Sequence, residues 1–324
     1  MKPLFRCAWV VCVCGLLWPA LSFAQQTYPT RSIRLISPYT PGGGNDILAR
    51  LLGHRLSEAW SQQVIVENRP GGNTIIGTDA LAKSPADGYT LMVVGSSHVL
   101  IPLLMKVPYD PIKDFATVAT LAIGDLTLVV NPSLPANNLR EFIALAKSKP
   151  GQLDYATYGA GSTGHLATEL LSMIAGLKMQ HIPYKGAGPA MADLVGGQVQ
   201  LFFGTTASVL SHVKAGTLKA IAISGDKRKP ALPDVPTFAE AGLPGFNVTF
   251  WYAVLAPAGT PKEIIDKLSA QIARILTLPD YKEKLATQGV EPFISTPEQF
   301  AALLRADMAT FAKVIKTANI KLEQ

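Results

Sequence analysis

The stretch that most constrains the fold is residues 32–52, S-I-R-L-I-S-P-Y-T-P-G-G-G-N-D-I-L-A-R-L-L, which predicts a strand, a glycine loop and a helix. Apolar residues alternate with other residues from Ile33 until two prolines end the run, and leucines recur at helical spacing after Asp46. A glycine loop between a strand and a helix leaves backbone N–H groups unpaired, and the helix dipole adds partial positive charge there. The stretch therefore predicts a site for a small anion that needs no cationic side chain.

A second glycine loop, G-A-G-S-T-G-H at residues 159–165, follows a predicted strand over Leu153–Tyr158 and opens another helix. The hydroxyls of Ser162 and Thr163 can add to its amides, although Ser162 can equally serve only to cap its own helix. The loop also fits G-x-G-x-x-G, but the next strand ends in Pro183-Tyr184-Lys185, without the carboxylate that a ribose needs. We therefore expect a second anion-binding loop opposite the first, and no nucleotide cofactor.

Residues 1–24 predict a cleavable secretory leader. Lys2 and Arg6 form a basic start, an apolar run continues to Leu17, and Ser22-Phe23-Ala24 is a small-x-small cleavage site before Gln25. The apolar run is too short for a membrane span. All three cysteines lie in this leader, so the secreted chain is expected to carry neither a disulfide nor a reactive thiol.

Charge and length narrow the function further. The formal charge of +6 falls to +4 without the leader, because the leader carries two basic residues and no acidic one. The charges are scattered, and the longest basic run is Lys227-Arg228-Lys229, so a nucleic-acid surface is not expected. A mildly positive protein suits a small anionic ligand. The 300 residues after the leader exceed one comfortable core, which favours two lobes.

Strands and helices alternate along almost the whole chain, which predicts a parallel sheet with helices on both faces. Two β-rich runs that end at proline, residues 126–132 and 248–257, enclose a complete set of these units. We interpret the two runs as extended crossings that act as hinges between two α/β lobes. Residues 25–125 and 251–324 then form the first lobe, which closes with three helices, and residues 126–250 form the second.

Other chemistries have weaker support. Ser97-His98 and Ser162…His165 suggest a nucleophile beside a base, but neither lies in G-x-S-x-G and neither has an obvious orienting acid. We expect His165 to pack in the first turns of its helix, pointing into the cleft or at a backbone carbonyl. Asp46 is expected to cap its helix, because a carboxylate beside a bound anion would repel it. Five dispersed histidines without H-E-x-x-H predict no metal site.

A set of motifs spread over the secreted chain resembles one family. The motifs are P-Y-T-P-G-G-G-N-D-I-L-A-R, E-N-R-P-G-G, D-G-Y-T-L, Y-D-P-I-K-D-F, H-I-P-Y-K-G, L-P-D-V-P-T-F-A-E-A-G-L-P-G and A-P-A-G-T-P. In this order they resemble the Bug-type family, the extracytoplasmic solute receptors of tripartite tricarboxylate transporters. The resemblance implies a type II periplasmic-binding-protein fold, with two α/β lobes that are joined by two extended crossings and close over a ligand.

The resemblance also implies where the ligand binds. In that family the loops matching Tyr39–Asn45 and Gly159–His165 hold the carboxylate of the ligand, partly through ordered water. This chain departs from the commoner forms at Asn45, where serine or threonine is frequent, and at residues 73–76, N-T-I-I, where a glycine pair is usual. These departures leave the identity of the ligand open. The candidate ligand-binding residues are Tyr39, Thr40, Gly42, Gly43, Gly44, Asn45, Asn73, Ser96, Ser97, His98, Tyr158, Gly159, Gly161, Ser162, Thr163, His165, Tyr184 and Thr205.

We therefore expect a monomeric periplasmic receptor, not an enzyme, that captures a small organic carboxylate for the membrane permease subunits of a tripartite transporter. It should need no cofactor or metal and bind no nucleic acid. No arginine lies in either glycine loop, so we expect capture by N–H groups, hydroxyls and water. Trp251 and Tyr252 either stack on the ligand or fill the hinge core. Two alternatives are a secreted hydrolase acting on a carboxylate or ester, and a sensory receptor for the same ligands.

Overall fold

The computed structural model describes residues 28–184 and 186–318, so the predicted leader and its cleavage site after Ala24 lie outside the described residues. The first part of the chain forms β1 (Ile33–Ser37), α1 (Gly44–Trp60), β2 (Val64–Asn68), α2 (Ile75–Ala82), β3 (Thr90–Gly95), α3 (Ser97–Leu104) and the long strand β4 (Phe115–Val130). The middle part forms α4 (Leu139–Ser148), β5 (Asp154–Thr157), α5 (Thr163–Ala175), β6 (Gln180–Pro183), α6 (Ala187–Val195), β7 (Leu201–Thr205), α7 (Thr206–Lys214) and β8 (Lys219–Ile223). The last part forms β9 (Thr249–Pro257), α8 (Lys262–Thr277), α9 (Pro279–Thr287), β10 (Val290–Pro292) and α10 (Pro297–Ala318).

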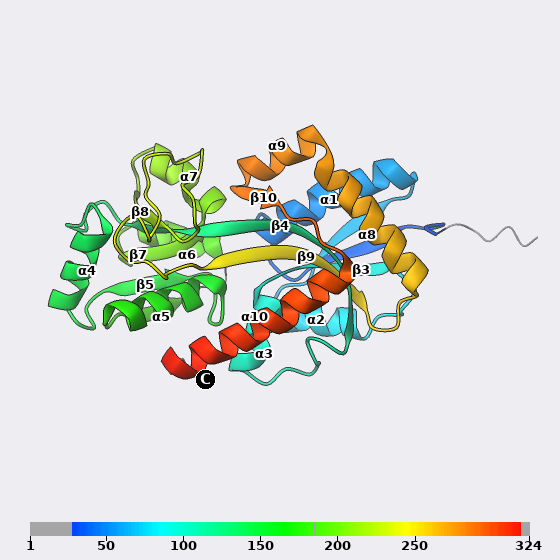
Figure 1. Ribbon diagram of the computed structural model, residues 1–324, viewed down its shortest axis with the longest axis horizontal. Helices are drawn as coiled ribbons and strands as arrows, with labels where there is room; N and C mark the ends of the chain where they lie inside the picture. The colour runs from blue at the N-terminus through cyan, green and yellow to red at the C-terminus, as the bar shows by residue number, and fades with distance from the viewer. Residues whose placement is uncertain (1–27, 185, 319–324) are drawn as a thin grey trace, which may run out of the picture.

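These elements form two α/β lobes joined by the long strands β4 and β9, which cross the middle of the molecule (Figure 1). The strand order is β2-β1-β3-β9-β4-β10 in the first lobe and β8-β4-β7-β5-β6 in the second. β4 changes partners between Asp125, which pairs with Thr249 of β9, and Leu126, which pairs with Thr205 of β7. The predicted fold of two lobes and two crossings is confirmed.

The predicted parallel arrangement holds for only part of each sheet. Three strands are parallel in each lobe, β2-β1-β3 in the first and β6-β5-β7 in the second. The crossing strands β4 and β9 run in opposite directions and lie antiparallel to those neighbours. A chain that leaves a lobe and returns to it must contribute such a pair of opposed strands, which the alternating pattern of the sequence does not reveal.

Apolar side chains fill the space between the sheets and the helices. One core extends through both lobes along β4, whose Leu121, Leu126 and Leu128 have no exposed surface. The run at residues 229–245, expected to be an ordered surface connection, places Phe238 in this core. Burying an aromatic side chain of this kind contributes about 1.5–3 kcal/mol to folding. The run is therefore held by packing.

The final helix links the two lobes without being a crossing. α10 lies along one side of the molecule and contacts α3 and β4, and also α5 of the second lobe (Figure 1). Leu166 of α5 belongs to the same apolar cluster as Phe300 and Leu304 of α10. The side chain of Asp307 accepts a hydrogen bond of 2.6 Å from the indole nitrogen of Trp251 in β9. The helix predicted to return to the first lobe thus packs on both lobes. In residues 28–318 as described, no helix is long and apolar enough to cross a membrane.

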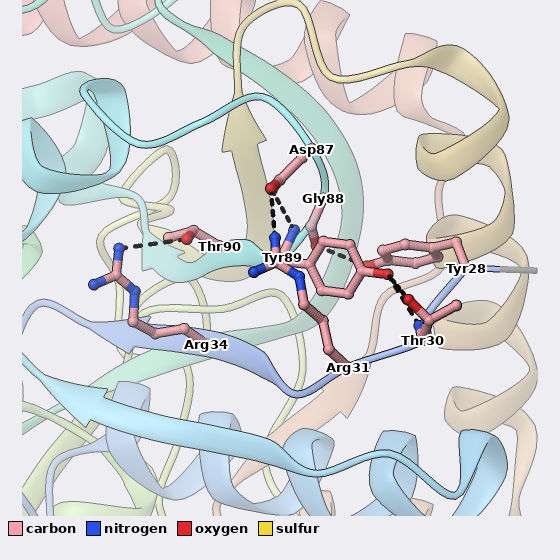
Figure 2. A network of polar contacts seen from close by, with 8 residues as sticks. All are labelled: Tyr28, Thr30, Arg31, Arg34, Asp87, Gly88, Tyr89 and Thr90. Atoms are coloured by element: carbon pink, nitrogen blue, oxygen red, sulfur yellow. Dashed lines mark hydrogen bonds and ion pairs between the residues drawn. The ribbon is translucent and has the colours of Figure 1, made fainter. Parts of the chain in front are cut away.

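The entry into β1 is tied to the turn before β3 (Figure 2). The Tyr28 hydroxyl donates to the Gly88 carbonyl over 2.7 Å, and the guanidinium of Arg31 pairs with Asp87 at 2.8 Å. The same guanidinium lies 4.2 Å above the ring of Tyr89. These contacts are at the amino ends of the strands, and they help fix the register of the strand that ends at the first glycine loop.

Candidate functional site

A cavity of about 270 Å³ lies between the lobes, at the carboxyl ends of the parallel strands. The first lobe lines it with residues that follow β1 and β3, and the second lobe with residues that follow β5, β6 and β7. Strand β9 adds Phe250, Trp251 and Tyr252. Open α/β sheets bind ligands at this end of their strands, because the loops there are free to vary. Both predicted glycine loops contribute lining residues.

Five helices begin at this cavity. The lining residues include Gly44 at the start of α1, Ser97 of α3, Thr163 of α5, Ala187 of α6 and Ala207 of α7. The first amides of a helix have no acceptor within the helix, and each helix dipole places partial positive charge at this end. The sequence had indicated two such N-termini. The structure brings five such N-termini together around one cavity.

The first glycine loop is fixed from outside the cavity by Asp46. The amide of Gly42 donates to the Asp46 carboxylate over 3.0 Å, and the carboxylate also accepts bonds from Arg50 and Asn68. Burial alone would raise the pKa of Asp46, but these hydrogen bonds outweigh it and hold the pKa below its usual range. The expectation that Asp46 caps α1 is wrong, since the N-cap is Gly43 and no side chain bonds there. The first amides of α1 are therefore left without a capping side chain.

Two close contacts shape the wall beside this loop. A methyl group placed on Gly44 would lie 2.2 Å from the hydroxyl oxygen of Tyr252, so a side chain at this position displaces the phenol. The side-chain amide of Asn45 donates to the Val93 carbonyl over 3.0 Å. The unusual asparagine thus ties α1 to β3 while lining the cavity.

The second glycine loop is fixed by neutral groups of its own lobe. Ser162 is the N-cap of α5 and accepts a hydrogen bond from the His165 amide at 3.3 Å. The Tyr158 hydroxyl accepts from the Gly164 amide at 3.0 Å, and Nδ1 of His165 accepts from the Gly161 amide at 3.1 Å. The expectation that His165 points into the cleft or at a carbonyl is wrong, because its ring accepts an N–H group. Thr163 is the member of this loop that lines the cavity.

Phenols and aliphatic hydroxyls supply further donors. The hydroxyls of Tyr39 and Ser97 lie 2.6 Å apart, and Thr205 caps α7 by accepting from the Ser208 amide. Burial raises the pKa of Tyr39, and burial together with the other phenols raises the pKa of Tyr252. These phenols therefore remain protonated donors at neutral pH. The described lining residues include no arginine or lysine, and Lys185 lies outside the described residues.

The lobes also approach each other around the cavity. A methyl group on Gly159 would lie 3.4 Å from Oδ1 of Asn73, and one on Gly186 would lie 3.7 Å from the Thr40 hydroxyl oxygen. On another side, a methyl group on Gly289 would lie 2.9 Å from the Ala207 amide nitrogen. Glycine at these positions lets the two lobes come close without a side chain between them.

The structure places the predicted ligand-binding residues in two groups. Those that line the cavity are Tyr39, Thr40, Gly42, Gly43, Gly44, Asn45, Ser96, Ser97, Tyr158, Thr163 and Thr205. Those that do not line it are Asn73, His98, Gly159, Gly161, Ser162, His165 and Tyr184. In the second group, the Tyr184 hydroxyl donates to Asp193 at 2.7 Å, and Asn73 lies beside Gly159 at the edge. The role of every one of these residues in ligand binding stays a prediction.

The serine and histidine pairs of the sequence are not paired in space. His98 is 3 % exposed, its Nε2 lies 2.9 Å from the Pro111 carbonyl oxygen, and burial lowers its pKa to about 4. The Ser97 hydroxyl is hydrogen-bonded to the Tyr39 hydroxyl, and the Ser162 hydroxyl accepts a hydrogen bond from the His165 amide. Neither serine has an imidazole base beside its hydroxyl, so this geometry does not assemble a nucleophile. Among the described residues, no group of three or more His, Cys, Asp or Glu is placed to hold a metal ion.

Several lining residues were not predicted. They are Ile47, Leu48, Gly95, Gly186, Ala187, Ala207, Ser208, Phe250, Gln288 and Val290. The junctions at Gly186 and Ser208 follow a strand and open a helix, so the argument used for the two glycine loops would have found them. Trp251 and Tyr252 do line the cavity, and both are more than nine-tenths buried. Both aromatics are therefore packed in the wall of the cavity, and their stacking on a ligand stays a prediction.

A sequence profile described as tripartite tricarboxylate transporter family receptor matches residues 48–320. The chain is 39% identical over 307 residues to Protein BugT of Bordetella pertussis, and the match covers 94% of each chain. These matches cover nearly the whole sequence and include both crossings.

Solved structures have the same fold. The structure of R. palustris Rpa4515 with adipate has a TM-score of 0.87 and 37% identity, and the match covers 91% of this chain and 99% of that one. The periplasmic binding protein BugD has a TM-score of 0.85 and 32% identity, covering 91% and 100%. MatC from Rhodopseudomonas palustris with bound malate has a TM-score of 0.81 and 31% identity, covering 89% and 100%.

Proposed function

This chain belongs to the tripartite tricarboxylate transporter family receptors, and from that premise we propose that it captures a small organic carboxylate between its lobes for the permease subunits of such a transporter. As a family member it is a periplasmic solute-binding receptor and not an enzyme. The finer points, namely the ligand, the residues that hold it and the partner in the membrane, are proposals.

The observation that carries the proposal is the convergence of five helix N-termini on one cavity. Each N-terminus contributes about 0.3–1 kcal/mol to binding an anion when exposed, and up to ~2 kcal/mol when partly buried. Hydrogen bonds from amides and hydroxyls to a charged oxygen add about 1.5–3 kcal/mol each. A carboxylate can therefore bind tightly through N–H groups, hydroxyls and water. We place its charged oxygens between Gly44 of α1 and Thr163 of α5, which line the cavity from opposite lobes.

The remaining walls favour a short carbon chain. Ile47, Leu48, Phe250 and Val290 give this part of the cavity apolar surface, and Gln288 adds an amide. The volume of about 270 Å³ suits a small molecule rather than a peptide or a nucleotide. Adipate and malate, the ligands found with two structural neighbours, are compounds of this size and charge. We propose the class of small aliphatic mono- and dicarboxylates.

We propose further that ligand capture is coupled to lobe movement about the crossings. The proposed lobes are residues 25–125 with 251–324 and residues 126–250, and the change of partners of β4 between Asp125 and Leu126 supports the first of these boundaries. A ligand that contacts both lobes favours the state in which they are together, whereas contacts to one lobe cannot shift the equilibrium. The radius of gyration measured by small-angle scattering should fall when the ligand is added. An unchanged radius at saturation would contradict the hinge proposal.

A thermal-shift screen of carboxylates, with adipate and malate included, tests the function directly. A bound ligand at 100 times its Kd should stabilise the protein by about 2.7 kcal/mol, and calorimetry should then give one site per chain. Recovery of the ligand unchanged supports a receptor. Turnover of the ligand, or the absence of any shift across the library, would contradict the proposal. The expected monomer is tested by light scattering of the same sample.

A further inference from the structure

One buried histidine of the second lobe contacts the glycine loop instead of the cavity. His165 is 4 % exposed, and its Nδ1 accepts a hydrogen bond from the Gly161 amide over 3.1 Å. An imidazole nitrogen accepts only while it carries no proton, so the neutral ring has its hydrogen on Nε2. Gly161 has a φ of 75°, in the left-handed region that glycine adopts most readily. The bond therefore fixes the amide at a bend of the loop.

A stack of aromatic rings holds the plane of this histidine. The ring of His181 lies 4.0 Å from that of His165, with 10° between the planes, and Tyr155 stacks on His181 at 4.9 Å. The Tyr155 hydroxyl donates in turn to the carboxylate of Glu169. Tightly packed rings cannot tilt without disturbing their neighbours. The stack thus presents Nδ1 of His165 to Gly161 in one orientation.

The same stack reaches the loop at a second point. Nε2 of His181 lies 2.7 Å from the Thr157 hydroxyl oxygen, and this hydroxyl donates to the Gly159 carbonyl over 3.2 Å. A hydroxyl has one proton, so the arrangement is satisfied when His181 donates from Nε2. Gly159 and Gly161, the two glycines of the loop with positive φ, are therefore both tied to the histidine pair.

Both rings are neutral near pH 7. Burial, together with the neighbouring His181, lowers the pKa of His165 to about 3, and burial lowers the pKa of His181 to about 4. A proton on Nδ1 of His165 would set one N–H group against another and break the bond to Gly161. The acceptor is thus present at neutral pH.

We propose that His165 is a positioning residue for ligand capture, whose Nδ1 lone pair holds the Gly161 amide and keeps the second glycine loop in the shape that brings Thr163 to the cavity. The inference rests on the proposed function, because it gives His165 a part in capture without contact to the ligand. A preformed loop needs no ordering when the ligand arrives, so its loss weakens binding even though no ligand contact is removed.

Two substitutions distinguish the effect of the hydrogen-bond acceptor of His165 from the effect of its ring. His165→Phe keeps an aromatic ring in the stack and removes the acceptor, whereas His165→Asn loses the stack and keeps a side-chain oxygen that can accept from Gly161. Amide hydrogen exchange of the ligand-free protein, followed by NMR, reads the bond directly. We expect exchange at Gly161 to be about tenfold faster in the phenylalanine variant and within about threefold of the original in the asparagine variant. His165→Leu serves if the phenylalanine variant does not fold.

His181→Phe is the matched control. It keeps the stack and removes the contact to Thr157, whose hydroxyl oxygen also accepts from the Gly159 amide at 3.4 Å. We therefore expect faster exchange at Gly159 while Gly161 keeps its protection. Unchanged exchange at Gly161 in His165→Phe would overturn the proposal. The proposal would also be overturned if the phenylalanine and asparagine variants lost the protection of the Gly161 amide equally and had the same fall in Tm. The ring of His165 would then act only by packing.

Calorimetry with adipate gives the second measurement. We expect the affinity to fall about tenfold in His165→Phe and to stay within about threefold in His165→Asn. An unchanged affinity in His165→Phe, with faster exchange at Gly161, would overturn the part of the proposal that concerns capture. If the original protein does not bind adipate, the carboxylate that most raises its Tm in the screen replaces adipate in this measurement. Exchange at Gly161 decides independently of any ligand whether His165 holds the loop.

Discussion

The two glycine loops of the cavity look alike in the sequence and are built in opposite ways. In the first loop, Gly42 and Gly44 are exposed, and the loop is held by the ionised carboxylate of Asp46. In the second loop, every residue from Gly161 to Thr168 is buried, and neutral acceptors hold the chain. The first loop is thus open and fixed by charge, and the second is enclosed and fixed by packing.

This difference assigns the loops different parts in anion capture. In the second loop, three backbone amides already donate hydrogen bonds to side chains of the protein, those of Gly161, Gly164 and His165. The first loop gives only the Gly42 amide to Asp46, and α1 has no side-chain cap. We infer that the first loop supplies most of the N–H donors for the ligand, whereas the second supplies a fixed surface against which the ligand is held. The comparison can be tested by damaging one loop at a time.

The largest effect is expected from Gly161→Val in the second loop. A β-branched residue at a φ of 75° costs at least about 1–2 kcal/mol, and the backbone shift that relieves this strain moves the amide of residue 161 away from Nδ1 of His165. We expect affinity for the carboxylate to fall by about 100-fold, equivalent to roughly 2.7 kcal/mol, measured by calorimetry.

Gly43→Ala in the first loop is the control for that experiment. Gly43 has an ordinary φ of −79°, and an added methyl group would lie 3.8 Å from the nearest atom, the Thr40 carbonyl oxygen. We expect its affinity to stay within about threefold, since no bond or contact is lost. Both Gly43 and Gly161 were predicted from the sequence to bind the ligand. Equal losses in both variants would contradict the contrast between the loops.

The next largest effect is expected from Gly44→Ala. The new methyl group would lie 2.2 Å from the Tyr252 hydroxyl oxygen, and the phenol must move within the cavity wall. We expect about a tenfold loss of affinity, roughly 1.4 kcal/mol. Tyr252→Phe removes the hydroxyl, so the double variant should recover part of that loss in a double-mutant cycle. Strict additivity of the two changes would show that the contact is unimportant.

Acid should destabilise the protein through its buried histidines. Burial lowers the pKa values of His98, His165 and His181 to about 4, 3 and 4, and the unfolded chain titrates near 6.5. The unfolded state therefore binds more protons below pH 6.5, and the free energy of unfolding falls as the pH drops toward 4. Each histidine contributes a slope of at most about 1.4 kcal/mol per pH unit. Urea titrations at several pH values should show that the free energy of unfolding depends less steeply on pH in His165→Asn than in the original protein. An identical pH dependence would show that His165 does not contribute to the acid sensitivity.

The smallest effect is expected from Asp46→Asn in the first loop. Asparagine can still accept from the Gly42 amide, but the charged bonds to Arg50 and Asn68 are weakened. We expect a loss of about 1–2 kcal/mol of unfolding free energy at pH 7 and a change of less than about threefold in affinity. Because the folded pKa of Asp46 is lowered, its contribution is present above pH 3.8 and disappears below it. The two proteins should therefore have the same stability in strong acid.

Local chemistry explains what the sequence could predict. The loops at residues 41–45 and 159–164 were found because glycine between a strand and a helix has a direct backbone consequence. The two lobes and two crossings could be predicted from the alternation of strands and helices and from the family motifs. α3 was not predicted, since it has eight residues and contains Pro102, which usually ends a helix. The three residues of β10 carry too little pattern to be recognised.

The direction of individual side chains could not be predicted. His98 and His165 are in the right segments for a ligand site, but each turns its ring toward a backbone group of the protein. The contact of Tyr252 with Gly44 joins residues more than 200 positions apart, and only the folded chain brings them together. The starts of α6 and α7 were within reach of the same reasoning, but their meeting at one cavity depends on the order of the strands.

The tryptophan in the cavity wall should make the intrinsic fluorescence of this receptor sensitive to the ligand. Within the described residues the tryptophans are Trp60 and Trp251, and Trp251 lines the cavity while its indole donates to Asp307 of α10. Trp60 lies at the end of α1, beside Tyr28, and does not line the cavity. A ligand that replaces water next to Trp251, or a shift of α10, alters the polarity around one indole and leaves the other as an internal reference. Emission of the unlabelled protein should therefore report occupancy in real time, and Trp60→Phe would isolate that signal.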